Sequence, residues 1–139
     1  MPSRPSDISA ALADFLAERH LASLTTLRAD ASPHVVPVGF SYDSAAGEVR
    51  IITFDGCQKV ANARRGGRAA VSQVDGGRWV TLEGVIHATT DPSEVAAAVA
   101  GYAARYQQPK ERPDRVALVI AVDRILASRG LLGADVPSA

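Results

Sequence analysis

The sequence predicts a mainly β fold, a six-stranded antiparallel split β-barrel with flanking helices, and three observations support it. Runs with strand character are mostly joined in pairs by short turns instead of alternating one by one with helices. The Asp-Gly-Gly sequence at 75–77 is a strong hairpin signal. The length of 139 residues, 47% of them hydrophobic, suits one domain with its own core. We therefore expect a single domain over 1–139, with a core of about 6–128 and a C-terminal tail over 129–139.

The first half of the chain is expected to form a helix and three strands. The helix begins near Ser6 and continues for about four turns, because apolar residues from Ile8 to Leu16 recur at helical spacing. A hairpin follows, formed by the extended runs LASLTTLRAD and HVVPVGFSYD around a turn at 29–33. The third strand is EVRIITF, after a turn that Asp43 and Gly47 favour.

The second half adds a short helix over 58–65, a hairpin, a longer helix and a final strand. The hairpin lies within GRAAVSQVDGGRWVTLEGVIHATTD. Asp91 suits a helix cap and Pro92 the first helical position, so we expect a helix from there to about Tyr106. The stretch QQPKERPD is then a loop, and RVALVIAVDRILAS is a long last strand.

Composition and motifs argue against several functional classes. Fifteen basic residues balance fifteen acidic ones, so no broad nucleic-acid-binding surface is indicated. One cysteine, no leader-like N-terminus and no stretch of about 18 apolar residues favour a cytoplasmic protein without membrane contact. The three histidines lack zinc-ligand spacing, and we expect no metal. The chain has no G-x-S-x-G elbow, Walker loop or G-x-G-x-x-G motif.

The stretch FDGCQKVANARRGGRAA, residues 54–70, concentrates cations in a chain without net charge. A strand, a glycine turn and a short helix follow one another here, so free N–H groups of the helix face the strand end. Lys59 adds a charge, and Thr53 and Asn62 add hydrogen-bonding groups. We interpret this arrangement as a local anion site. For Thr53 and Asn62, ordinary structural hydrogen bonding stays open, and Cys57 is a weaker candidate nucleophile without an identifiable base.

Five further residues are candidates for ligand contact. Arg64, Arg65 and Arg68 are placed to hold a longer polyanionic tail, although a solvated helix face is the alternative. Trp79, the only tryptophan, is placed at the mouth of a hairpin where it covers a planar ligand or is half-buried core. Its neighbour Arg78 suits a carboxylate.

Long stretches of the chain also carry a resemblance to a known family. They are FLAERHLASLTTLRADASPHVVPVGFSYD, RIITFDGCQKVANARRGGRAAVSQVDGGRWVTLEG, AARYQQP and RVALVIAVDRIL, and they span about Ser6 to Ser128. They resemble the flavin and deazaflavin oxidoreductase superfamily, whose fold is the split β-barrel of pyridoxamine 5'-phosphate oxidase-like proteins. Within it, the strings most resemble the F420-dependent biliverdin reductases of actinobacteria.

The resemblance implies a homodimer with coenzyme F420 in a cleft at the interface, and FMN is the alternative cofactor. It implies hydride transfer from the reduced deazaflavin to biliverdin, which gives bilirubin. The cofactor would supply this chemistry, so no catalytic triad is needed, and no catalytic residue or proton donor is identified. Two alternatives stay open: an FMN-dependent pyridoxamine-phosphate-type oxidase and a non-catalytic protein that binds F420 or a tetrapyrrole.

Carried over position by position, the resemblance implies three groups of cofactor contacts. Lys59 would be the main phosphate ligand, and Cys57 stands where relatives often have a serine. The other contacts implied around the phosphate are Gln58, Cys57 and Asn62; those along the ring and ribityl chain are Ile52, Thr53 and the backbone of Val36, Pro37 and Val38; those at the cleft edge, from this or the other subunit, are Arg78 and Trp79.

Overall fold

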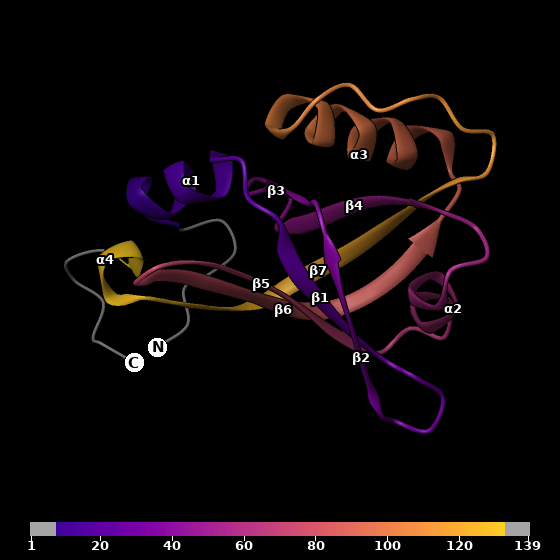
Figure 1. Cartoon of the computed structure of the whole chain (residues 1–139), viewed down its shortest axis with the longest axis horizontal. Helices are drawn as coiled ribbons and strands as arrows, with labels where there is room; N and C mark the ends of the chain where they lie inside the picture. Colours follow the sequence, from indigo (N-terminus) through magenta and orange to yellow (C-terminus); the bar gives the residue numbers. More distant parts are fainter. Residues whose placement is uncertain (1–7, 133–139) are drawn as a thin grey trace.

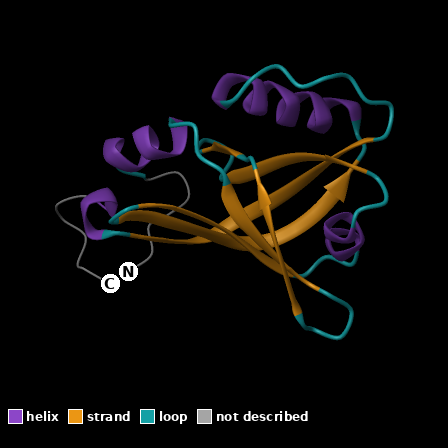
Figure 2. Cartoon of the chain, viewed as in Figure 1, coloured by secondary structure: helices purple, strands orange, loops and turns teal. Residues whose placement is uncertain are grey.

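A computed structural model describes residues 8–132 and shows an antiparallel sheet of seven strands with helices around it (Figures 1 and 2). The strand order is β2-β1-β5-β6-β7-β4-β3. Helices α1 and α4 lie at one end of the sheet and α2 at the other, while α3 runs along one side (Figure 1). In chain order the elements are α1 (Ala10–Ala17), β1 (Ala22–Leu27), β2 (Pro33–Val38), β3 (Ser41–Asp43), β4 (Glu48–Phe54), α2 (Gln58–Arg64), β5 (Arg68–Asp75), β6 (Arg78–Thr89), α3 (Pro92–Arg105), β7 (Arg115–Ala127) and α4 (Arg129–Leu132).

The sheet closes on itself because its two edge strands are consecutive in the chain. β2, at one edge, ends at Val38, and β3, at the other edge, begins at Ser41. Only Gly39 and Phe40 lie between them, and extended chain spans at most about 3.6 Å per residue. The two edges therefore come within roughly 11 Å of each other at this point. This β2–β3 turn, Gly39 and Phe40, closes the sheet into the barrel that the sequence predicts.

Most of the predicted elements are confirmed. β1 pairs with β2, and β5 pairs with β6 around Gly76, whose φ of +62° is a conformation that glycine adopts readily. β4 covers the predicted EVRIITF. Helix α3 begins at Pro92, and the side chain of Asp91 accepts a hydrogen bond from the backbone N–H of Glu94, as the cap signal predicts.

The strand count and the first helix differ from the prediction. HVVPVGFSYD is two strands instead of one, because the chain turns at Gly39 and Phe40 and the second part pairs with β4. Helix α1 is about two turns long instead of four. It begins at Ala10, where Ser9 serves as the cap by accepting from the backbone N–H of Leu12 at 3.0 Å. The predicted start at Ser6 lies outside the described residues.

A fourth helix, α4, follows the last strand in the region predicted as a tail. Leu131 and Leu132 are buried in the core, and the Ser9 hydroxyl donates a hydrogen bond to the backbone oxygen of Leu131. The core therefore extends past residue 128, and residues 133–139 lie outside the part that is described. Among residues 8–132, none of the helices has the length and apolar character needed to cross a membrane.

The sheet buries one face and leaves part of the other open. Along β6, Val80, Leu82 and Ile86 are buried, whereas Thr81 and Val85 between them are partly or fully exposed. A period of two is typical of a sheet that is covered on one side only, and it also holds for β1, β2 and β5. We call the uncovered side the open sheet face. Its residues are Ser23, Thr25, Val35, Pro37, Ala70, Ser72, Val74, Trp79, Thr81, Glu83 and Val85.

Candidate cofactor site

A hollow of about 310 Å³ lies where the ends of β2 and β4 meet helices α2 and α3, and we call it the α2–α3 hollow. It brings together residues from five separate parts of the chain. Five of the residues predicted as cofactor contacts line it, namely Pro37, Val38, Ile52, Thr53 and Lys59. The other lining residues are Gly39, Phe54, Tyr102, Pro109, Arg112 and Arg115.

Pairing between β4 and β7 builds the cationic side of the hollow. Phe54, the last residue of β4, lies opposite Arg115, the first residue of β7. The backbone N–H of Asp55 donates to the carbonyl of Asp114 at 3.0 Å and holds the loop before β7 against the end of β4. Arg112 thereby reaches the Phe54 ring, with its guanidinium carbon 4.1 Å from the ring centre.

Lys59 approaches the same ring from helix α2, with Nζ 5.9 Å from the ring centre of Phe54. Arg112 donates two hydrogen bonds to Asp114, at 2.8 and 3.0 Å, and this pairing holds the pKa of the Asp114 carboxyl below its ordinary value. Lys59 has no ion pair with any residue between 8 and 132. Its charge is therefore free to pair with an anion that enters the hollow.

A larger hollow of about 640 Å³ adjoins this one and shares Pro109, Arg112 and Arg115 with it. Its other walls are Val95 and Val99 of α3 and the residues around Pro109 in the loop that follows. The two hollows thus lie side by side, one at the end of β4 and the other along the loop before β7. Arginine side chains stand where they join.

The other residues predicted around the phosphate lie outside the lining. Cys57 is half-buried at the cap of α2, with its sulfur 3.8 Å from the Thr53 hydroxyl. Asn62 is buried, and its Nδ2 donates to the Thr26 hydroxyl at 2.9 Å. Its Oδ1 accepts from Gln58 at 2.8 Å and from an arginine side chain. The Asn62 side chain thus anchors α2 to β1, the structural alternative that the sequence left open.

The three arginines predicted for an anionic tail each have a partner within the chain. Arg64 pairs with Asp55 at 2.9 Å, and Arg68 donates two hydrogen bonds to Asp123, at 2.5 and 2.8 Å. Both pairings hold the carboxyl pKa values of the two aspartates below their ordinary range. Arg65 donates to the backbone oxygen of Leu27 at 2.7 Å and to a side chain of its own helix. None of these arginines lines the α2–α3 hollow.

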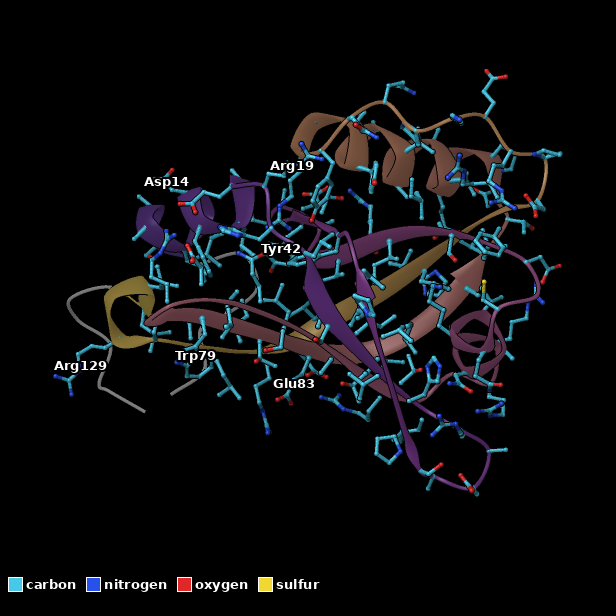
Figure 3. The ribbon with its side chains drawn as sticks, viewed as in Figure 1. Asp14, Arg19, Tyr42, Trp79, Glu83 and Arg129 are labelled. Atoms are coloured by element: carbon cyan, nitrogen blue, oxygen red, sulfur yellow. The ribbon has the colours of Figure 1, made fainter. Side chains whose placement is uncertain are left out.

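Arg78 and Trp79 lie on opposite faces of β6. Arg78 donates to both carboxylate oxygens of Glu18, at 2.7 and 2.9 Å, and to Asp75 at 2.6 Å. Its guanidinium lies 4.5 Å from the ring centre of Phe15, at the end of the sheet near α1 and α4. Trp79 is half-buried on the open sheet face, where its side chain points away from α1 and α3 (Figure 3). Neither residue lines the α2–α3 hollow.

Val36, also predicted along the ring, is half-buried on the core side of β2 and packs against the core. A predicted contact through its backbone does not depend on where this side chain points. The lining of the α2–α3 hollow begins one residue later, at Pro37.

One cluster in the described part of the chain has the composition of a metal site. Donor atoms of Glu18, His20 and Asp75 lie within 4.8 Å of one another. Arg78 donates to both carboxylates, so its guanidinium already supplies the positive charge that a cation would bring. Arg78 also holds the pKa of Glu18 at about 2, and His20 adds a smaller effect. This arrangement is an ion-pair cluster.

Sequence reasoning missed the α3 and loop side of the hollow. Tyr102 faces it from α3, and Arg112 and Arg115 face it from the segment before β7 and from the start of β7. The loop QQPKERPD contains cations at a density close to that of residues 54–70, and this was a readable signal. The sequence could not place this loop at the hollow, because only the pairing of β4 with β7 brings it there.

The open sheet face carries large apolar side chains. Val74 is 67% exposed, Val35 is 57% exposed and Val85 is 50% exposed, and Leu21 beside them is 67% exposed. A shallow depression of about 320 Å³ on this face is lined partly by Val74 and Pro37. Pro37 also lines the α2–α3 hollow, so the hollow borders the open sheet face at this residue.

Comparisons with known proteins identify the family and the fold of the chain. The family model described as pyridoxamine 5'-phosphate oxidase matches residues 8–129. An F420H(2)-dependent biliverdin reductase of Mycobacterium tuberculosis (strain CDC 1551 / Oshkosh) is 51% identical over 118 residues, which are 85% of this chain and 86% of that protein.

Solved structures share the fold. A conserved hypothetical protein of Mycobacterium tuberculosis superposes with a TM-score of 0.73 at 24% identity, over 99% of this chain and 98% of that one. A structure named F420 reductase superposes with a TM-score of 0.66 at 24% identity, over 81% of this chain and 94% of that one. The family match over nearly the whole chain and the 51% identical relative carry the assignment: the chain belongs to the pyridoxamine 5'-phosphate oxidase family.

Proposed function

We propose that this protein is an F420H2-dependent reductase that transfers a hydride to biliverdin and forms bilirubin. The observation that carries the proposal is the α2–α3 hollow, where five residues expected to contact the cofactor meet, and one of them, Lys59, has no ion pair within residues 8–132. The relative that is 51% identical bears the name of this activity.

The residues of the hollow fit a planar group with an anionic end. Ile52, Phe54 and Tyr102 give one part of the lining an apolar and aromatic surface for a ring. Lys59 and Arg112 give another part the charge that a phosphate requires. We assign Lys59 as the phosphate ligand, with the backbone of the β2 end against the ring.

The structure also favours a different path for the anionic tail from the one the sequence indicated. Arg64 and Arg68 are each paired with an aspartate outside the hollow. Arg112 is also paired, with Asp114, but Arg112 and Arg115 line both the α2–α3 hollow and the larger hollow. We propose that the oligoglutamate tail follows this path beneath the loop before β7.

When it is bound, reduced F420 supplies a hydride from carbon 5, and the protein needs no nucleophile of its own. The chain's residues bind and orient: Lys59 fixes the anionic end, and the apolar walls exclude water from the ring. Positioning of this kind accounts for a site without a catalytic triad.

We further propose a homodimer that forms through the open sheet face. The exposed Val35, Val74 and Val85 give this face an apolar surface, and a second copy of the same face would cover it. Because Pro37 belongs to both the face and the hollow, the hollow would then lie at the dimer interface. Trp79 points outward from this face and is the residue we assign to the partner's cleft, whereas Arg78 stays with Glu18.

Anaerobic mixing of the purified protein with reduced F420 and biliverdin tests the function. Fluorescence of oxidised F420 should recover as biliverdin is consumed and bilirubin appears. Tight F420 binding without turnover would instead identify a carrier protein. A purified protein that is yellow with a flavin spectrum, and does not bind F420, would identify the FMN-dependent oxidase.

Val74→Asp tests the dimer, because it places a charge among the exposed apolar side chains of the open sheet face. We expect the wild-type protein to sediment as a dimer and the variant as a monomer with weaker F420 binding. Ala104→Asp, on an exposed position of α3, is the matched control and should stay dimeric. A wild-type monomer that binds F420 normally would contradict the interface.

A further inference from the structure

The last two residues of the α3 segment, Arg105 and Tyr106, hold a turn that forms part of the hollow. Val38 and Gly39 line the α2–α3 hollow, and Phe40 follows them in the β2–β3 turn. Phe40 lies between two strands, so its backbone N–H and carbonyl have no partner in the sheet. Both groups are satisfied by side chains from the end of α3.

Tyr106 supplies the first of these bonds. The backbone N–H of Phe40 donates to the Tyr106 hydroxyl at 3.2 Å, and that hydroxyl donates to the carbonyl of His20 at 2.6 Å. Burial is the main cause that raises the pKa of Tyr106, so the hydroxyl keeps the proton that it donates. One hydroxyl thus joins the β2–β3 turn to the segment before β1.

Arg105 supplies the second bond, to the carbonyl of Phe40. It is only 9% exposed, and it donates to the carbonyl of Phe40 and to the carbonyl of Glu18, each at 2.8 Å. It also donates to the side-chain oxygen of Gln73. Its guanidinium lies 4.6 Å from the ring centre of Phe40. A buried arginine whose bonds go to three separate segments fixes those segments relative to one another.

The same end of α3 sets the spacing at Gly39. A Cβ atom added to Gly39 would lie 3.1 Å from the Tyr102 ring and 3.2 Å from the Tyr106 ring. The two tyrosine rings pack together with centres 4.8 Å apart. The backbone at Gly39 is therefore pressed against α3, and Tyr102 completes the lining of the hollow beside it.

We propose that Arg105 and Tyr106 are positioning residues for the cofactor: they hold the backbone of Val38 and Gly39 at the spacing that the ring requires. The inference rests on the proposed function. Neither residue lines the hollow, so they act through the turn and not through contact with the ligand. A preformed wall lowers the cost of ordering the site when the cofactor binds.

Tyr106→Phe and Arg105→Lys test the proposal in the full-length protein. The first removes one hydroxyl, and the second keeps the charge but loses the planar fork. In both variants the backbone amides of residues 38–40 should exchange with deuterium faster than in the wild type. The Kd for oxidised F420 should rise about three- to ten-fold, the effect of one lost hydrogen bond, and KM for reduced F420 should rise more than kcat falls.

Ile125→Val is the control, because it trims a buried side chain of β7 whose strand partner is on β6. It should lower the melting temperature and leave the Kd for F420 and exchange at residues 38–40 unchanged. A purely structural role of Tyr106 would make Tyr106→Phe behave like this control.

Wild-type exchange at residues 38–40, or faster exchange with wild-type F420 affinity, would overturn the proposal. If Tyr106→Phe does not fold, Arg105→Lys decides it by the same two readouts. A wild-type protein that fails to bind F420 would overturn the function and the positioning role together. The exchange data, which need no cofactor, would then still distinguish this outcome from a failure of the turn contacts.

Discussion

Two ends of this molecule place cations over an aromatic ring, and they differ in what else surrounds the cations. In the α2–α3 hollow, Lys59 and Arg112 lie over the ring of Phe54, a residue that is 39% exposed. Near α1, Arg78 lies over Phe15, which is completely buried. The first ring has an open side that a ligand can reach, and the second does not.

The carboxylates make the larger difference. Near α1, Arg78 donates to both Glu18 and Asp75. In the hollow, Asp114 pairs with Arg112, while Lys59 has no ion pair within residues 8–132. Among these cations, Lys59 is the one that the fold leaves without a carboxylate partner in residues 8–132, whereas Arg78 and Arg112 are already paired. The predictions below test that distinction.

Lys59→Ala should have the largest effect. A charge-assisted contact to a phosphate contributes about 1.5 to 3 kcal/mol, so the Kd for F420 should rise about ten-fold or more. Fluorescence titration with oxidised F420 measures it. Lys59→Arg keeps the charge and should recover part of the affinity; wild-type affinity in the alanine variant would remove Lys59 from the site.

Arg112→Ala should have an intermediate effect that depends on salt and tail length. Loss of this cation should weaken binding of F420 with several glutamates about two- to five-fold at low salt, and less at high salt. F420 with one glutamate should be less affected.

Asp114→Asn sharpens this prediction, because it removes the carboxylate that pairs with Arg112. Binding of long-tailed F420 should become tighter in this variant, opposite to the alanine change. Changes in the same direction, or equal effects on both tail lengths, would contradict the tail path along Arg112 and Arg115.

Arg78→Met should change stability and its pH dependence, with a smaller effect on binding. Arg78 is the main cause of the low pKa of Glu18, about 2 in the folded protein against an ordinary 4.5. Because the pKa of Glu18 is depressed in the folded protein, the Arg78–Glu18 pair stabilises the fold above about pH 4.5. This stabilisation is lost as the pH falls toward 2.

Melting temperatures measured between pH 7 and pH 3 test this pH dependence of the Arg78–Glu18 pair. The wild type should melt higher than Arg78→Met at pH 7, and the difference should shrink as the pH falls below 4.5. A difference that is constant over this range would show that Glu18 does not depend on Arg78.

The sequence predicted what local patterns encode and missed what distant pairing creates. The cap at Asp91 and the turn at Gly76 depend on a few neighbouring residues, and both are confirmed. Lys59 was predicted because a strand, a turn and a helix follow one another, and it lines the α2–α3 hollow. Arg112 was missed because it reaches Phe54 only through the pairing of β4 with β7.

The same reasoning explains Asn62. Its partner on β1, Thr26, is 36 residues away, so no local pattern distinguishes an anchoring amide from a ligand-binding one. The break of HVVPVGFSYD at Gly39 is comparable, because partners at the end of α3 hold that turn. Positions that depend on distant partners are therefore the ones where structure adds most.

Arg64→Ala should have the smallest effect, although Arg64 belongs to the cationic stretch that first indicated an anion site. Its guanidinium pairs with Asp55 at 2.9 Å, and both side chains are about half-exposed. Exposed pairs of this kind contribute little to stability, and Arg64 does not line the hollow. We expect less than about a two-fold change in the Kd for F420 of either tail length at low salt. A loss of affinity confined to long-tailed F420 would indicate that the tail binds along α2. The distinction between paired and unpaired cations would then fail at this residue.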